Sequence, residues 1–127
     1  MPSDPEDWLS DWERRAQEQA ELSTELSRRM REAGASAGSP GGEVHLSVDH
    51  TGGLSDLRLT DRAMYLGADE LAALILDASR RAQARMAEQM AEAARSLYGS
   101  DSPTTAFIAD TYTAQFPAPD DDGGDRR

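Results

Sequence analysis

Three neighbouring arginines in the second half of the chain carry the side chains best suited to a chemical role: Arg80, Arg81 and Arg85. No acidic residue occurs between Asp77 and Glu88, so this stretch carries three positive charges. A guanidinium group donates paired hydrogen bonds to phosphate oxygens, which is the chemistry of contact with a nucleic-acid backbone. The alternative is a solvated helix face, because helical spacing also lets these arginines pair with the flanking acids.

The overall charge of the chain opposes such contact. It has 24 acidic residues and 13 basic residues, every one of them an arginine, and a formal net charge of −11. From Asp101 onward there are six acids and two arginines, so part of this charge lies after the expected fold. DNA repels an acidic body at long range, so binding requires a local group of arginines. The further candidates are Arg14 and Arg15, followed by Arg28, Arg29 and Arg31.

Catalytic and metal-binding patterns are not found in the sequence. There are no cysteines. His45 alternates with apolar neighbours and His50 falls in a turn, and a metal site needs further ligands that converge on such residues. Gly52 and Gly53 lack the context of a phosphate loop, and no nucleophile elbow or dinucleotide fingerprint occurs. We therefore predict surface histidines, no cofactor, no metal and no enzymatic activity.

The elements that position the arginines are indicated by a change of hydrophobic period near Met64. Before it, apolar residues alternate with polar ones over 43–49 and 54–60, around a glycine-bearing link at 50–53, which predicts a β-hairpin. From Leu71 the apolar spacing becomes helical and continues to Tyr98, where Gly99 ends the helix. A weak edge strand over 31–37 is an open alternative to a linker, because small residues form poor strands.

A first helix is predicted from Glu6 to about Arg29, rich in good helix formers. Its narrow apolar stripe is closer to a coiled-coil seam than to a wide core face. Trp8 and Trp12, one turn apart on this stripe, indicate core or dimer packing, with a partner-binding surface as the alternative. The residues expected in the core or the dimer contact are Trp12, Leu22, Leu26, Val44, Leu46, Val48, Leu57, Leu59, Leu71, Leu74 and Ile75.

The chain therefore divides into a flexible leader at 1–5, an α-β-β(-β)-α domain at 6–99 and a mostly disordered acidic tail at 100–127, with one short docked segment around 105–112. The fold class is α+β: a long helix, a small antiparallel sheet of two or three strands, and a second long helix. About 90 ordered residues rich in alanine bury little apolar area, so we expect a second copy to complete the core. No stretch has the roughly 18 apolar residues of a membrane span, and we expect a cytoplasmic protein.

This order of elements, with Val44-His45-Leu46-Ser47-Val48, Gly53-Leu54-Ser55-Asp56-Leu57-Arg58-Leu59 and Glu70-Leu71-Ala72-Ala73-Leu74-Ile75, resembles the YbaB/EbfC family of nucleoid-associated proteins, closest to its actinobacterial branch. The resemblance covers roughly 11–99. It implies an intertwined homodimer with joined sheets and tweezer-like helix pairs, located in the nucleoid, that binds duplex DNA.

Two functions stay open at this point. One is non-specific DNA binding through the helix arginines Arg14, Arg15, Arg80, Arg81 and Arg85. The other is a chaperone or adaptor of the same fold with a protein partner, similar to the EspL-like proteins that are tied to type VII secretion.

Overall fold

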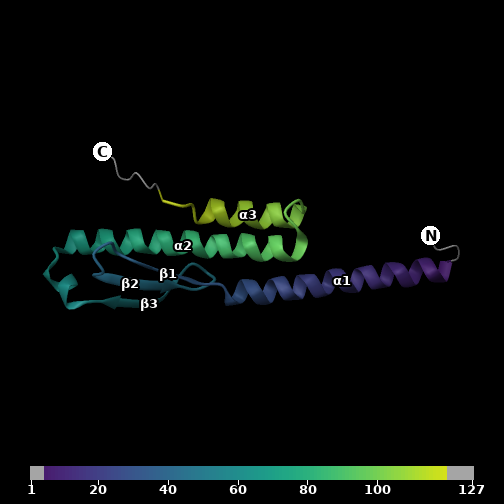
Figure 1. The fold of residues 1–127 in the computed structure, drawn as a ribbon, viewed down its shortest axis with the longest axis horizontal. Helices are drawn as coiled ribbons and strands as arrows, with labels where there is room; N and C mark the ends of the chain where they lie inside the picture. Colours follow the sequence, from purple (N-terminus) through teal and green to yellow (C-terminus); the bar gives the residue numbers. More distant parts are fainter. Residues whose placement is uncertain (1–4, 120–127) are drawn as a thin grey trace.

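The computed structural model describes residues 5–119, and Figure 1 shows them as one long sheet-and-helix body. The elements in chain order are α1 (Pro5–Glu32), β1 (Ala35–Gly38), β2 (Val44–Val48), β3 (Leu54–Leu59), the 3-10 helix η1 (Asp61–Tyr65), α2 (Ala68–Tyr98) and α3 (Pro103–Gln115). The three strands form one antiparallel sheet in the order β1-β2-β3. The predicted α+β class is confirmed, and the weak edge strand forms over 35–38.

The sheet buries one face against α2. Val44, Leu46 and Val48 of β2 are almost fully buried, whereas His45 between them is exposed. This alternation follows from the two-residue period of a strand. Since α2 packs on β1 and β2, the middle strand supplies the apolar surface that holds the long helix on the sheet.

The alanines of α2 explain how the protein forms a core with few large apolar side chains. Ala78, Ala82, Met86 and Met90 lie on the stripe that meets the sheet, and all four are buried. A small side chain lets the helix axis approach the sheet closely, while the two methionines fill the irregular space left between the helix and the sheet. The core is therefore narrow, and it ends at β2.

The C-terminal part of the chain is more ordered than the sequence indicates. A docked segment was expected around 105–112 within a mostly disordered tail, but α3 extends over Pro103–Gln115 and packs along α2. Ser102 caps it by accepting a hydrogen bond from the Thr104 amide at 3.0 Å, and buried Thr105 donates to the carbonyl of Gly99 at 2.6 Å. The acidic run at 120–122 lies outside the described residues.

The turn between β2 and β3 is held from both sides. Gln83 of α2 donates to the Gly52 carbonyl at 2.8 Å, and the ring of Phe116, just after α3, lies against Gly52. Asp49 accepts hydrogen bonds from the amide and hydroxyl of Thr51, which lowers the pKa of the Asp49 carboxyl. The turn therefore joins the hairpin, α2 and the segment after α3.

Gly52→Ala is expected to destabilise the protein by about 1–3 kcal/mol, because Gly52 has a positive φ of 86°. In addition, a Cβ there would lie 2.5 Å from the Phe116 ring. The measurement is the free energy of unfolding in urea, with Gly53→Ala as the control, since a Cβ at Gly53 meets no atom closer than 3.4 Å. Equal losses in the two variants would contradict the close packing of Phe116 on the turn.

Several of the expected core or dimer residues are not covered by any other part of residues 5–119. Leu26 is buried, and Leu22, Leu71, Leu74 and Ile75 are half-buried. Trp12, Leu57 and Leu59 are exposed at 54%, 43% and 39%. Leu57 and Leu59, the two exposed leucines of this set, both lie on β3, so the uncovered part of the sheet is the β3 edge.

No helix within residues 5–119 has the length and apolar character needed to cross a membrane.

Candidate nucleic-acid interface

Arg81 of α2 is anchored on the sheet. Its Nη2 donates to the carbonyl of Gly38 at 2.7 Å, and its Nε donates to Asp77 one helical turn earlier at 3.0 Å. Arg85 repeats the first contact one turn later, with Nη1 donating to the Ser36 carbonyl at 2.6 Å. Of the five arginines predicted to contact DNA, three lie on α2, and two of these three therefore bind the protein's own backbone.

Gln89 continues this row. Its side-chain amide donates to the Gly34 carbonyl at 2.6 Å and accepts from the Gly34 amide at 3.0 Å. We call Arg81, Arg85 and Gln89, spaced four residues apart, the edge strap. Ser39 donates its amide to the Val44 carbonyl, so the odd-numbered residues of β1 face β2 and the carbonyls of 34, 36 and 38 point outward. The strap covers the backbone edge that β1 would otherwise present to solvent.

Arg80 differs from its neighbour. Its side chain is exposed and, within residues 5–119, it makes no hydrogen bond or ion pair. A guanidinium has five N–H donors, so Arg80 offers its full set to a ligand. Arg81 and Arg85 offer the donors that the edge strap leaves over. This part of α2 thus holds one unoccupied cation and two partly occupied ones.

Arg14 and Arg15 on α1 lie in a different electrostatic setting. Arg14 pairs with Asp11 and, at 3.5 Å, with Glu18, and Arg15 pairs with Asp11 at 3.0 Å. Residues 5–21 hold six acidic residues against these two arginines. The structure places this half of α1 at the opposite end of the long axis from the sheet (Figure 1). It does not bring the two arginine groups together.

The fold adds two arginines that sequence reasoning did not select. Arg62, in η1, donates to the Gly41 carbonyl at 3.1 Å and lies 3.8 Å from a carboxylate oxygen of Glu43. Because Arg81 binds Gly38 and Arg62 binds Gly41, the β1–β2 turn joins η1 to the arginines of α2. Arg58 lies on β3, where its alternation with apolar neighbours places it on the solvent side of the sheet. That alternation is the signal in the sequence that identifies it.

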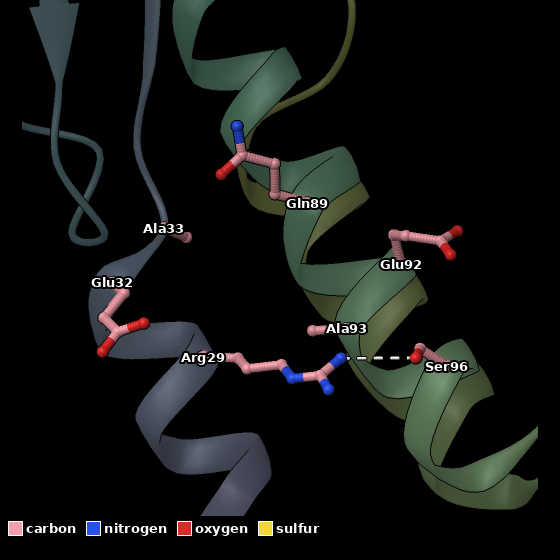
Figure 2. Close-up of a pocket in the computed structure, with 7 residues that line it drawn as sticks. All are labelled: Arg29, Glu32, Ala33, Gln89, Glu92, Ala93 and Ser96. Atoms are coloured by element: carbon pink, nitrogen blue, oxygen red, sulfur yellow. Dashed lines mark hydrogen bonds between the residues drawn. The ribbon is translucent and has the colours of Figure 1, made fainter.

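The residues that line the groove between α1 and α2 do not form a catalytic group. It has a volume of about 440 Å³ and is lined by Arg29, Glu32, Ala33, Gln89, Glu92, Ala93 and Ser96, as Figure 2 shows. Arg29 crosses it to donate to the Ser96 hydroxyl at 3.3 Å. Arg28 and Arg29 also bond Glu25 and lower the pKa of its carboxyl to about 2. Within residues 5–119 no group of acidic or histidine side chains converges as a metal site would require.

These features define a small α+β domain with basic side chains along one long helix and no reactive centre in its main groove. The model of the YbaB/EbfC DNA-binding family matches residues 7–101, three quarters of the chain. The chain belongs to this family of nucleoid-associated DNA-binding proteins, which is not an enzyme family. No curated protein and no solved structure matches it. Helix α3 lies entirely beyond the matched residues.

Proposed function

We propose that this protein is a homodimeric nucleoid-associated protein that binds duplex DNA with little sequence specificity, through phosphate contacts from the arginines of α2. The observation that carries the proposal is the family match over 7–101. The stretch from Ala78 to Ala87 supports it, with three arginines and no acid. Such a surface contacts phosphates rather than base edges, so it positions the protein without reading sequence.

The homodimer is supported by the uncovered side of β3. Leu57 pairs with Leu46 and Leu59 pairs with Val44, so both lie on the face of the sheet that α2 covers over β1 and β2. Helix α2 does not extend over β3, and both leucines remain exposed. When a second copy adds its β3 to this edge, the two β3 strands pair and the sheet continues into the second copy. The α2 helix of the second copy then covers Leu57 and Leu59, which we call the leucine row.

We rank the arginines as phosphate contacts by how far the donors of each guanidinium are already used within the protein. Arg80 is the principal contact, because no side chain or backbone group competes for it within residues 5–119. Arg81 and Arg85 add the donors left over by the edge strap. Arg14 and Arg15 contribute only where phosphate replaces their carboxylate partners, an exchange that exposed ion pairs permit at small cost.

The experiment is a salt titration of binding to a random-sequence duplex. The logarithm of the association constant is expected to fall linearly with the logarithm of the salt concentration, by about 0.9 for each phosphate contacted. Arg80→Ala should weaken binding equally on all sequences and reduce that slope by about 1. Arg95→Ala is the matched control, because Arg95 is also on α2 but pairs with Glu92 near the other end of the helix.

Absence of binding at low salt, for the folded wild-type protein, would contradict the proposal. It would favour the second candidate function, an adaptor or chaperone of the same fold. One observation favours that candidate: both tryptophans stand exposed on the acidic half of α1. A pull-down from cells that returns DNA and no protein would exclude it.

A further inference from the structure

A second face of α2, away from the sheet, is lined by four alanines at helical spacing, which we call the alanine face: Ala84, Ala87, Ala91 and Ala94. Helix α3 packs along α2, and three of these alanines are buried outside the core under the sheet. Thr105 near the start of α3 donates to the Ala94 carbonyl at 3.2 Å, whereas Thr113 near its end lines a small hollow of about 180 Å³ with Ala84. Helix α3 is therefore antiparallel to α2 and runs along it toward the sheet (Figure 1).

Arg80 occupies the next position of the alanine face. It precedes Ala84 by four residues, and side chains at this spacing lie on the same side of a helix. The segment after α3, residues 116–119, continues in the direction of Arg80, and its Ala118 lines the same hollow as Ala84 (Figure 1). Arg80 is exposed and makes no hydrogen bond or ion pair within residues 5–119. The alanine face therefore ends in a cation that no group of α3 binds.

The length of chain after Ala118 matches the distance to Arg80. The four residues from Ala84 to Arg80 span about 6 Å along the axis of α2. Two prolines flank Ala118, and they restrict the chain to extended conformations in which each residue spans about 3 Å. Two residues beyond Ala118 therefore cover this distance. The second of them is the first of three consecutive aspartates at 120–122, which we call the acidic run.

We propose that the acidic run binds Arg80 of the same chain and competes there with DNA phosphate, an inference that rests on the proposed function. A carboxylate offers a guanidinium the same paired acceptors as a phosphate does. The run is tethered a few residues away, which gives its carboxylates an effective concentration on the order of millimolar at this site. Two arginines follow the run only at 126 and 127, after a Gly-Gly pair, so the run itself contains no compensating cation.

The net charge of −11 does not prevent this contact. Six of the acids lie within residues 5–21, on the half of α1 far from the sheet (Figure 1), and charges further apart than the Debye length of about 8–10 Å are largely screened. On α2 the acid nearest to Arg80 in sequence is Asp77, whose carboxylate is paired with Arg81 at 3.0 Å. Glu88 lines the hollow but lies two helical turns beyond Arg80. The charge around Arg80 is therefore positive.

The first test measures DNA binding by the full-length chain. Asp120→Asn/Asp121→Asn/Asp122→Asn should raise the association constant for a random-sequence duplex by about three- to tenfold at low salt, because the apparent affinity falls as the fraction of molecules with an occupied Arg80 rises. The gain should shrink as salt screens the carboxylates. In the Arg80→Ala background the same triple substitution should leave the affinity unchanged.

Glu6→Gln/Glu13→Gln/Glu21→Gln is the matched control, because it removes the same number of charges from α1, away from Arg80. It should raise the affinity by less than about twofold, since distant charges are screened. An equal gain in both triple variants would overturn the proposal, because net charge alone would then explain it. A gain of the same size in the Arg80→Ala background would overturn it as well.

The second test needs no DNA. Because the protein has no cysteine, Gly123→Cys accepts a single nitroxide label next to the acidic run. At low salt the label should broaden the amide NMR signals of residues 78–82, and replacing the three aspartates by asparagine should relieve much of this broadening. Equal broadening with and without the three aspartates would overturn the contact, because the tether alone would then account for it.

Together the two tests separate failure of the tail contact from failure of the proposed function. Charge-dependent broadening in a protein that binds no DNA would support the contact between the acidic run and Arg80 and overturn DNA binding. DNA binding that the triple asparagine substitution leaves unchanged, with broadening that does not depend on the aspartates, would overturn the contact and leave DNA binding in place.

Discussion

Leu57→Glu is expected to convert the proposed homodimer into a monomer. Leu57 lies on the α2 side of the sheet, opposite buried Leu46, yet it is 43% exposed because α2 does not extend over β3. A glutamate there places a charge where the proposed second copy buries its leucine row, and an unpaired buried charge is strongly unfavourable. The dimer dissociation constant should rise by at least about 100-fold. The measurement is the mass of the protein in solution by light scattering, compared with that of the wild type.

Arg58→Glu is the matched control for this result. Arg58 is the next residue of the same strand, and its side chain lies on the opposite face of the sheet, where Asp56 is its ion-pair partner. It therefore changes the charge of β3 without entering the leucine row, and the dimer should persist. Loss of the dimer in both variants would indicate that net charge, not the buried row, decides association. An unchanged mass for Leu57→Glu would place the dimer contact away from β3.

The elements of this protein were predictable because each one follows from a local period. Alternation fixes Val44, Leu46 and Val48 on the buried face of β2, and Gly99 ends α2 at the position expected. The sequence alone does not decide whether β1 forms, since the propensities of Ala35 and Ser36 favour a linker. Tertiary contacts make it a strand, because β2 on one side and the edge strap on the other form hydrogen bonds with its backbone groups.

Helix α3 and the roles of the arginines depend on contacts that no local pattern contains. Helix α3 has few large apolar residues, and Ile108, Tyr112 and, just after the helix, Phe116 gain their packing only because the chain folds back along α2. Likewise, the sequence shows that Arg80, Arg81 and Arg85 share a helix. It does not show that two of them reach the carbonyls of β1, since that depends on the distance between α2 and an edge strand.

Arg81→Ala/Arg85→Ala is the second variant for which we expect a large effect, and the effect is on stability as well as on DNA binding. Each arginine donates a charge-assisted hydrogen bond to an outward carbonyl of β1. Water can solvate the freed carbonyls at this exposed edge, so removing each donor costs about 0.5–1.5 kcal/mol. The double variant should therefore lose about 1–3 kcal/mol of unfolding free energy. The measurement is urea unfolding at equilibrium.

Arg80→Ala separates the two effects. It removes a neighbouring arginine of the same helix that has no partner within residues 5–119, so its unfolding free energy should stay within about 0.5 kcal/mol of the wild type while its DNA affinity falls. Equal stabilities for Arg80→Ala and Arg81→Ala/Arg85→Ala would contradict the edge strap. If Arg81→Ala/Arg85→Ala binds DNA weakly, two effects contribute: the lost phosphate contacts and the loosened β1. Only the loss caused by Arg80→Ala measures the phosphate contact alone, because Arg80 leaves the sheet edge intact.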